Sequence, residues 1–293
     1  MNAHRYRSIF RPGLFDGAVV VVTGGGSGIG RCTAHELAHL GARVVLVGRK
    51  ADKLDAVRAE IEADGGRALT YALDIRDEDA VRAAVAAIVE DAGPIDGLFN
   101  NAGGQYPAPA ESITAKGFDA VVRTNLTGGF LMAREVYVQS MRARGGSIVN
   151  MLADMHGGMP GMAHSGAARA GMENLTKTLA FEWAQSGVRV NAVAPGWIAS
   201  SGLDRYEGPA RAMIPRLAGA VPLQRLGTEA EVSAAVCFLL SEAASFITGA
   251  VVRIDGGASL GNRLWPLPRH DRSRPFQGFH RYEPPRVLGE GDD

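Results

Sequence analysis

The order of hydrophobic and polar positions predicts short strands alternating with helices over most of the chain. Several runs rich in Val, Ile and Leu are apolar at consecutive positions, which is typical of strands buried on both faces of a parallel sheet. We expect seven strands, at Ala18–Thr23, Arg43–Val47, Ala68–Leu73, Gly97–Asn100, Ser147–Met151, Arg189–Ala194 and Val251–Ile254.

Amphipathic patterns fill the intervals between these runs, and a glycine follows most of them, as at a helix C-terminus. We expect helices at Gly30–Leu40, Asp52–Asp64, Asp77–Asp91, Asn125–Ala143 and Gly166–Gln185. This alternation predicts an α/β fold, a single doubly wound (Rossmann) domain over residues 10–261 with a seven-stranded parallel sheet.

Two segments interrupt the alternation. Residues 197–226 are rich in Gly, Pro, Arg and Met, which is typical of a mobile lid over a site. Residues 262–293 contain five prolines and scattered arginines. They predict an irregular C-terminal tail that lies on the domain surface or on a neighbouring subunit.

Composition narrows the class of protein. The chain is 46% hydrophobic, and its 31 basic residues balance 31 acidic ones, so no overall charge favours nucleic acid or an anionic membrane. No apolar run approaches the ~20 residues of a membrane helix. Cys32 and Cys237 are far apart in helical patterns, which indicates core residues in a reducing compartment, with no disulfide and no metal ligands. The first residues lack the apolar core of a signal peptide, so we expect a cytoplasmic protein.

A glycine-rich turn follows the first strand directly. Such a turn can bring backbone N–H groups and a helix N-terminus close to the pyrophosphate of a dinucleotide. A simple tight turn is the alternative, but the position between the first strand and a helix favours the cofactor. The expected contacts come from Gly24, Ser27, Gly28, Ile29 and Gly30.

The residues at the end of the second strand indicate which dinucleotide binds. An NAD site places an acidic residue there, about 20 residues beyond the glycines. This chain has Arg49 and Lys50 instead, and such cations can bind a 2′-phosphate. Two solvated charges at a helix start are the alternative; NADP(H) is the preferred cofactor.

Four motifs in order resemble the short-chain dehydrogenase/reductase family over about residues 15–260. They are Thr23-Gly24-x-x-x-Gly28-x-Gly30, Asn100-Asn101-Ala102-Gly103, Asn125 and Pro195-Gly196. The resemblance implies that Asp74 and Ile75 flank the adenine, and that Asn125 is a catalytic residue that holds a water. An N-cap of the following helix is the other interpretation of Asn125. The resemblance also implies cofactor contacts from Asn101, Ala102, Gly103, Pro195, Gly196 and Ile198.

A closer resemblance is to the peroxisomal trans-2-enoyl-CoA reductase branch, which reduces the α,β double bond of enoyl thioesters with NADPH. It rests mainly on the stretch from His164 to Gly171, written HSGAARAG, and on the loop Gly103-Gly104-Gln105. The chain ends in Glu-Gly-Asp-Asp without a Ser-Lys-Leu type signal, which again favours a cytoplasmic enzyme. Family members pair their long helices and last strands, which implies a homotetramer.

The family usually carries a tyrosine and a lysine where this chain has Ser165 and Arg169. Residues four apart share a helix face, so Arg169 can keep the ribose contact of the lysine while Ser165 faces the substrate. Serine can donate a hydrogen bond but is too weak an acid to replace tyrosine in carbonyl reduction. Reduction of a conjugated double bond needs donors at the thioester oxygen instead, so we expect this reaction.

The proton donor and the substrate stay open at this stage. Asp154, His156 and His164 could deliver the α-proton, or they could be ordinary loop and helix-end residues. The expected partner is a small molecule, an acyl-CoA, whose phosphates could meet arginines of the lid. The alternatives are an NADP-dependent alcohol or aldehyde dehydrogenase for branched or terpenoid substrates, with Asp154 or His156 replacing the tyrosine, and a catalytically silent cofactor-binding protein.

Overall fold

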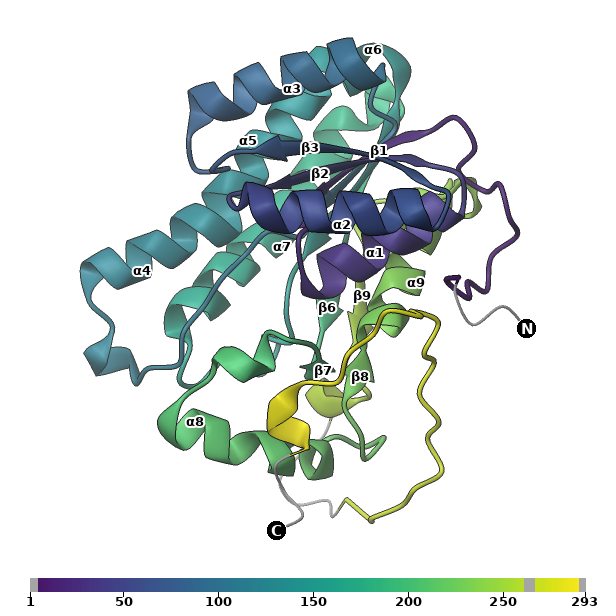
Figure 1. Cartoon of the computed structure of the whole chain (residues 1–293). Helices are drawn as coiled ribbons and strands as arrows, with labels where there is room; N and C mark the ends of the chain where they lie inside the picture. Colours follow the sequence, from purple (N-terminus) through teal and green to yellow (C-terminus); the bar gives the residue numbers. More distant parts are fainter. Residues whose placement is uncertain (1–4, 261–266, 290–293) are drawn as a thin grey trace.

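Seven parallel strands form one sheet in the order β3-β2-β1-β4-β5-β6-β9, in a computed structural model that describes residues 5–260 and 267–289. This is the sheet expected from the sequence, and each strand lies within two residues of its expected bounds (Figure 1). The strands are β1 (Val19–Thr23), β2 (Arg43–Gly48), β3 (Arg67–Ala72), β4 (Gly97–Asn100), β5 (Gly146–Met151), β6 (Val188–Pro195) and β9 (Val251–Ile254).

Helices cover both faces of this sheet, as in a Rossmann domain. One hydrophobic cluster joins α1, α2 and α9 to one face, and a second joins α3, α5 and α7 to the other. The helices are α1 (Gly28–His39), α2 (Ala51–Ala63), α3 (Glu78–Ala92), α4 (Ala115–Val122), α5 (Gly128–Val136), α6 (Arg142–Arg144), α7 (Ala163–Trp183), α8 (Gly208–Met213) and α9 (Glu229–Leu240).

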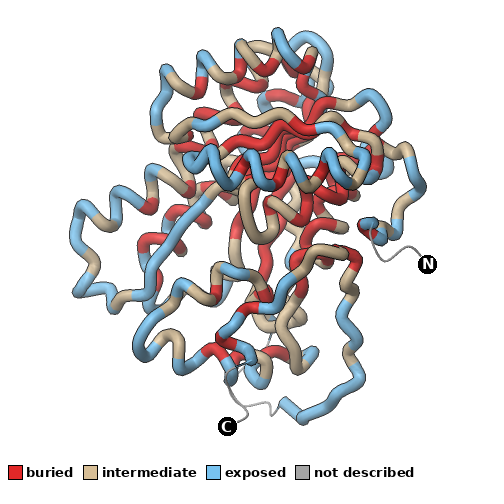
Figure 2. The backbone as a smooth tube through the Cα atoms, viewed as in Figure 1, coloured by how far each residue is buried: buried red, intermediate tan, exposed pale blue. Residues whose placement is uncertain are grey.

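The central strand β1 shows why the strands are apolar at consecutive positions. Val20 and Val22 belong to the cluster on the α1 face, whereas Val19 and Val21 belong to the cluster on the α3 face. Alternate side chains of a strand point to opposite faces, and here both faces are covered. Figure 2 shows the result as a buried layer through the middle of the molecule.

The expected helix at Asn125–Ala143 begins ten residues earlier than predicted, at Ala115 of α4. Thr114 is its N-cap, with its hydroxyl accepting from the Gly117 N–H. The helix passes through a π-helical stretch, Arg123–Thr127, before it continues as α5. The N-cap interpretation of Asn125 is therefore wrong, because Asn125 lies inside a helix that another residue caps.

The segment expected to form a lid begins and ends at a small parallel sheet. Strands β7 (Ile198–Ala199) and β8 (Gly227–Thr228) pair with each other, so the two ends of the segment lie side by side. Between them the chain forms α8 and short 3-10 turns. This arrangement suits a segment that moves as a unit about a fixed base.

The described part of the C-terminal tail, residues 267–289, lies across the domain (yellow in Figure 1). Phe279 is buried with Tyr6 and Cys32, and Val287 packs against Leu203 and other apolar residues of the lid segment. The tail therefore joins α1 to the lid. Residues 261–266 and 290–293, which complete the predicted tail, lie outside the described residues.

Both cysteines are free and buried, Cys32 in α1 and Cys237 in α9, as expected for core residues. Within the described part of the chain, no helix combines the length and the apolar character that crossing a bilayer requires.

Candidate active site

A cavity of about 580 Å³ opens at the carboxyl ends of the central strands. In doubly wound sheets this edge is where ligands bind, because the strand order reverses there. Residues from six parts of the chain line it, one of which is α1 through Ile29. They include Asn101, Gly103 and Gln105 after β4, Met151 and Asp154 after β5, Arg169 of α7, Pro195 and Gly196 at the end of β6, and Ile198, Arg205 and Tyr206 of the lid segment.

The glycine turn between β1 and α1 has the geometry of a phosphate cradle. Gly24 adopts a φ of 68°, a left-handed conformation that favours glycine. A Cβ added to Gly30 would lie 2.4 Å from the Gly24 carbonyl oxygen, so no larger residue fits there. The turn therefore leaves the N-terminus of α1 open to a dinucleotide, and its residues fit that group.

The loop after β4 is tied to this cradle by hydrogen bonds. The Thr23 hydroxyl accepts from the N–H groups of Asn101 and Ala102, at 3.0 and 2.9 Å. The Asn101 amide donates to the Thr23 carbonyl at 3.0 Å. Residues that the resemblance assigns to the cofactor thus lie together on one rim of the cavity.

The adenine end of the predicted cofactor site carries more positive charge than negative. Arg49 and Lys50 are exposed after β2. Asp74 forms a bidentate pair with Arg76, whose hydrogen bonds are the main reason that the pKa of this carboxyl falls to about 2. Asp74 therefore stays ionised but paired with Arg76, so its charge is offset beside the exposed Arg49 and Lys50.

Asn125 and Arg169 fix the loop that borders the cavity. The Asn125 side chain accepts from the Gly104 N–H at 2.8 Å and donates to the Gly104 carbonyl at 3.0 Å. The Arg169 guanidinium donates to the Met151 carbonyl and lies against Gly103, where an added Cβ would be 2.5 Å from Nη2. Burial lowers the pKa of Arg169 to about 10, which leaves it charged at neutral pH.

Ser165 does not reach the cavity directly. It has no exposed surface, and its hydroxyl donates to Oε1 of Gln105 at 2.7 Å. Nε2 of Gln105 donates to the Tyr206 hydroxyl of the lid segment at 3.1 Å. Gln105 therefore connects Ser165 to the cavity and to the lid. Sequence reasoning did not assign it a role, because a loop glutamine has no periodic pattern and the contact spans 60 residues.

Of the three candidate proton donors, Asp154 alone lines the cavity. Burial, and next the negative charge of Asp255, raise the pKa of its carboxyl. His156 is exposed, and His164 is fully buried, with Nδ1 accepting from the Ser165 N–H at 2.7 Å and its ring against Tyr106. The geometry therefore favours Asp154 as the proton donor.

Another carboxyl, Glu229 at the start of α9, lies beside the glycine cradle. A Cβ on Gly28 would be 3.8 Å from its Oε1. Burial raises the pKa of Glu229 to about 7. The sequence offered no signal for this residue, because an acidic residue in the first turn of a helix is usually solvated.

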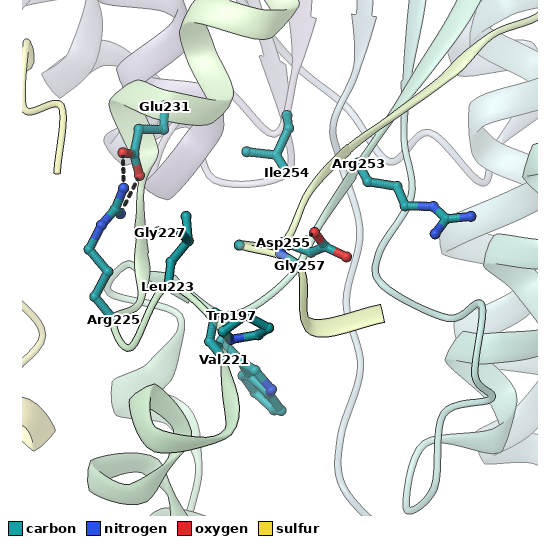
Figure 3. Close-up of a pocket in the computed structure, with 12 residues that line it drawn as sticks. Trp197, Val221, Leu223, Arg225, Gly227, Glu231, Arg253, Ile254, Asp255 and Gly257 are labelled. Carbon is teal, nitrogen blue, oxygen red and sulfur yellow. Dashed lines mark hydrogen bonds and ion pairs between the residues drawn. The ribbon is translucent and has the colours of Figure 1, made fainter. Parts of the chain in front are cut away.

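A second cavity, of about 600 Å³, lies beneath the lid segment and is shown in Figure 3. Its main charged groups are already paired. Arg225 donates to both carboxylate oxygens of Glu231, and Asp255 accepts from the Gly257 N–H and from Ser259. Arg225, one of the lid arginines that were expected to meet CoA phosphates, is thus already bound within the protein.

The family follows from comparison with known proteins. The family model described as enoyl-(acyl carrier protein) reductase matches residues 24–259, which include the cradle, the Asn101 loop, Ser165 and Arg169. The chain belongs to the short-chain dehydrogenase/reductase family. It is an oxidoreductase, and the family binds a nicotinamide dinucleotide.

Similar short-chain dehydrogenases/reductases act on different molecules. A peroxisomal 2,4-dienoyl-CoA reductase of Danio rerio is 37% identical over 88% of this chain and 86% of its own length. Gluconate 5-dehydrogenase of Gluconobacter oxydans is 39% identical over 85% of this chain and 98% of its own. The structure of a citronellol catabolism dehydrogenase of Pseudomonas aeruginosa PAO1 is 61% identical, with a TM-score of 0.79, and covers 87% of this chain and 100% of that one.

Proposed function

We propose that this protein catalyses the NADPH-dependent reduction of the α,β double bond of trans-2-enoyl-CoA thioesters. The observation that carries the proposal is the hydrogen bond from Ser165 to Gln105 at 2.7 Å. Ser165 supplies a hydroxyl and Gln105 an amide in the region where the family usually has a titrating tyrosine. Such a pair can stabilise an oxyanion, but it cannot supply the proton that carbonyl reduction requires.

Gln105 is the group that faces the substrate in this proposal, and Ser165 positions it. A glutamine amide has two N–H donors, of which one is directed at Tyr206. Because the Ser165 hydroxyl donates to the amide oxygen, it holds the amide orientation and polarises its N–H groups. Donation to a thioester oxygen that becomes an enolate contributes about 3–4 kcal/mol per donor. NADPH, when bound, supplies the hydride for the β-carbon.

Asp154 supplies the proton for the α-carbon. Its carboxyl borders the cavity, and burial together with the negative charge of Asp255 raises its pKa towards the range of a general acid. Asn125 holds the Gly104 backbone, which sets the position of the neighbouring Gln105. In this proposal Gln105 and Ser165 stabilise the oxyanion, and Asp154 delivers the proton.

NADPH is proposed over NADH because Arg49 and Lys50 are exposed at the end of β2 and the charge of the nearby Asp74 is offset by its pairing with Arg76. Replacing Arg49 by Asp removes a cation and introduces repulsion toward a 2′-phosphate. We expect Arg49→Asp to weaken NADPH binding at least about tenfold while NADH binding stays equal or improves. Titration of protein fluorescence with each cofactor measures this. Equal affinity of the unchanged protein for both cofactors would exclude the preference.

A second candidate is the oxidation of a branched or terpenoid alcohol or aldehyde. The 61% identity to a citronellol catabolism dehydrogenase favours it. Asp154 would then act as the acid and base at the carbonyl oxygen, since it is the titrating candidate that lines the cavity.

Transfer of deuterium distinguishes the two candidates. The protein is incubated with NADPH deuterated at the transferable position and with either a trans-2-enoyl-CoA or citronellal. The proposal predicts deuterium at the β-carbon of the saturated thioester. Deuterium at C1 of an alcohol, with unlabelled thioester, would establish the second candidate instead. Tight NADPH binding with neither product would contradict both and indicate a catalytically silent protein.

A further inference from the structure

Three side chains from distant parts of the sequence meet on the α1 face, away from the active-site cavity. They are His35 of α1, Asp64 at the C-cap of α2 and His280 of the tail. Their side chains are 2%, 18% and 9% exposed. One ligand atom from each lies within 4.8 Å of the other two.

The spacing of these atoms suits a tetrahedral metal ion. Oδ2 of Asp64 is 3.4 Å from Nδ1 of His35 and 3.0 Å from Nε2 of His280. A tetrahedral ion with ligands at about 2.0–2.1 Å separates neighbouring ligand atoms by ~3.4 Å. Two imidazoles and one carboxylate form a ligand set that zinc accepts, with the fourth position left for water.

Glu60 holds His35 in the orientation that such an ion requires. Oε2 of Glu60 lies 3.1 Å from Nε2 of His35, and Arg31 holds Glu60 through two hydrogen bonds. With its proton on Nε2 toward Glu60, His35 directs the Nδ1 lone pair at the Asp64 carboxylate. Two acceptors then face each other, and a cation between them removes the conflict. A carboxylate behind a ligating histidine is a common feature of metal sites.

The charges facing the cluster limit which ion would bind. Arg281 contacts Asp64 through Nη2 and Nε, and Arg31 lies behind Glu60, so two guanidinium groups offset two carboxylates. Burial opposes ionisation of both acids, but these contacts hold the pKa of Asp64 below its usual value and that of Glu60 at about 2. Because little net negative charge remains, affinity would come from the imidazoles, which favours zinc over magnesium or calcium.

We propose that His35, Asp64 and His280 form a zinc-class metal site that fastens the C-terminal tail to α1. The neighbouring residue Phe279 is 2% exposed, and its ring centroid lies 5.1 Å from the His35 ring and from the Arg31 guanidinium carbon. A bound ion would hold this contact on the helix that begins at the glycine cradle. The site lies outside the proposed active site and does not depend on the proposed function.

Zinc titration of tag-free, chelator-treated full-length protein tests the site, by calorimetry and by thermal unfolding. We expect one ion per chain at micromolar affinity or tighter, with a rise in Tm at saturating zinc. His280→Ala should weaken binding at least about tenfold and abolish the rise. His270→Ala is the matched control, because His270 is an exposed tail histidine bonded to the Pro222 carbonyl.

Cobalt(II) provides a readout that is independent of stability. Tetrahedral cobalt absorbs visible light much more strongly than the hydrated ion, and we expect this absorption in the unchanged protein and in His270→Ala but not in His280→Ala. Failure to bind zinc below millimolar concentration, or equal binding by both variants, would overturn the proposal. Tail stability that depends on pH but not on metal would also overturn it, since it would indicate protonated histidines paired with Asp64.

Discussion

At the scale of single residues, the contact between Ser165 and Gln105 explains how this chain can lack the tyrosine of its family and still have a polar active site. The sequence indicated Ser165, because the motif around it is local. It did not indicate that Ser165 is fully buried behind Gln105, because that depends on how the loop after β4 folds over α7. Asp154 was one of three candidates in the sequence, and only its position on the cavity distinguishes it.

Removing either member of this pair should affect turnover more than cofactor binding. We expect Ser165→Ala and Gln105→Ala each to lower kcat by about 10- to 1000-fold, the range for loss of one oxyanion donor. The double variant should be little worse than either single one, because the two residues act as a unit. Kinetics with a trans-2-enoyl-CoA measure this, together with NADPH binding, which should change little. Arg169→Ala is the contrasting variant and should weaken both turnover and cofactor binding. Additive losses would show that the residues act separately.

Glu229 should make the free energy of unfolding depend on pH. Burial raises its pKa from 4.5 to about 7, so the folded state holds this proton more tightly than the unfolded state does. The stabilisation is therefore complete below pH 4.5 and is lost as the pH rises to about 7. Glu229→Gln should stabilise the protein at pH 8 by on the order of 2–3 kcal/mol at most, with no gain near pH 4.5.

Thermal unfolding of this variant at both pH values provides the measurement. Glu62→Gln on α2 is the control, because Glu62 is exposed and should show no difference between the two conditions. An equal effect of Glu229→Gln at both pH values would show that the residue is not titrating in this range.

At the scale of helices and strands, the hydrophobic pattern predicted most of the fold. Buried parallel strands are apolar on both faces, and this signal is local, so all seven were placed correctly. The helix starting at Ala115 was placed too late. The π-helical stretch around Asn125 and the start of α5 read Thr-Asn-Leu-Thr-Gly-Gly, most of whose residues usually favour caps and turns. Packing of α4 on α7 compensates for this weak propensity, and packing is not visible in the local pattern.

The lid segment is the element whose conformation should depend on ligand. Its ends are fixed by the pairing of β7 with β8, and it contacts the active site through Tyr206. We expect trypsin to cut at Arg205 and Arg216 more slowly when an acyl-CoA and NADPH are bound. Mass spectrometry of timed digests measures this. Cutting at Arg144 of α6, an exposed site outside the lid segment and the tail, is the internal control and should not change. Equal cutting of the lid at saturating acyl-CoA would count against a CoA substrate.

At the scale of the whole molecule, exposed aromatic side chains agree with the expected homotetramer. Phe181 of α7 is 86% exposed, and Phe246 between α9 and β9 is fully exposed. Large exposed apolar residues on the helix that the family pairs, and on the segment that leads to the paired strand, favour burial in an oligomer. We predict a mass of four 30.8 kDa chains by light scattering, and a smaller assembly for Phe181→Glu. A mass of one chain for the unchanged protein would contradict this prediction.

The central claim is that a site built on Gln105 and Ser165 reduces conjugated double bonds and not carbonyl groups. The most direct measurement is the ratio of kcat/KM for a trans-2-enoyl-CoA to that for an aldehyde of matched chain length, with NADPH. The account predicts a ratio of at least about 100, because general-acid assistance at the carbonyl oxygen is worth roughly 10²–10⁴-fold and neither Ser165 nor Gln105, in place of the tyrosine, can provide it. A ratio below one would contradict the account if Ser165→Ala also leaves the rate on the aldehyde unchanged. It would indicate that Asp154 is the acid and base of a carbonyl reduction.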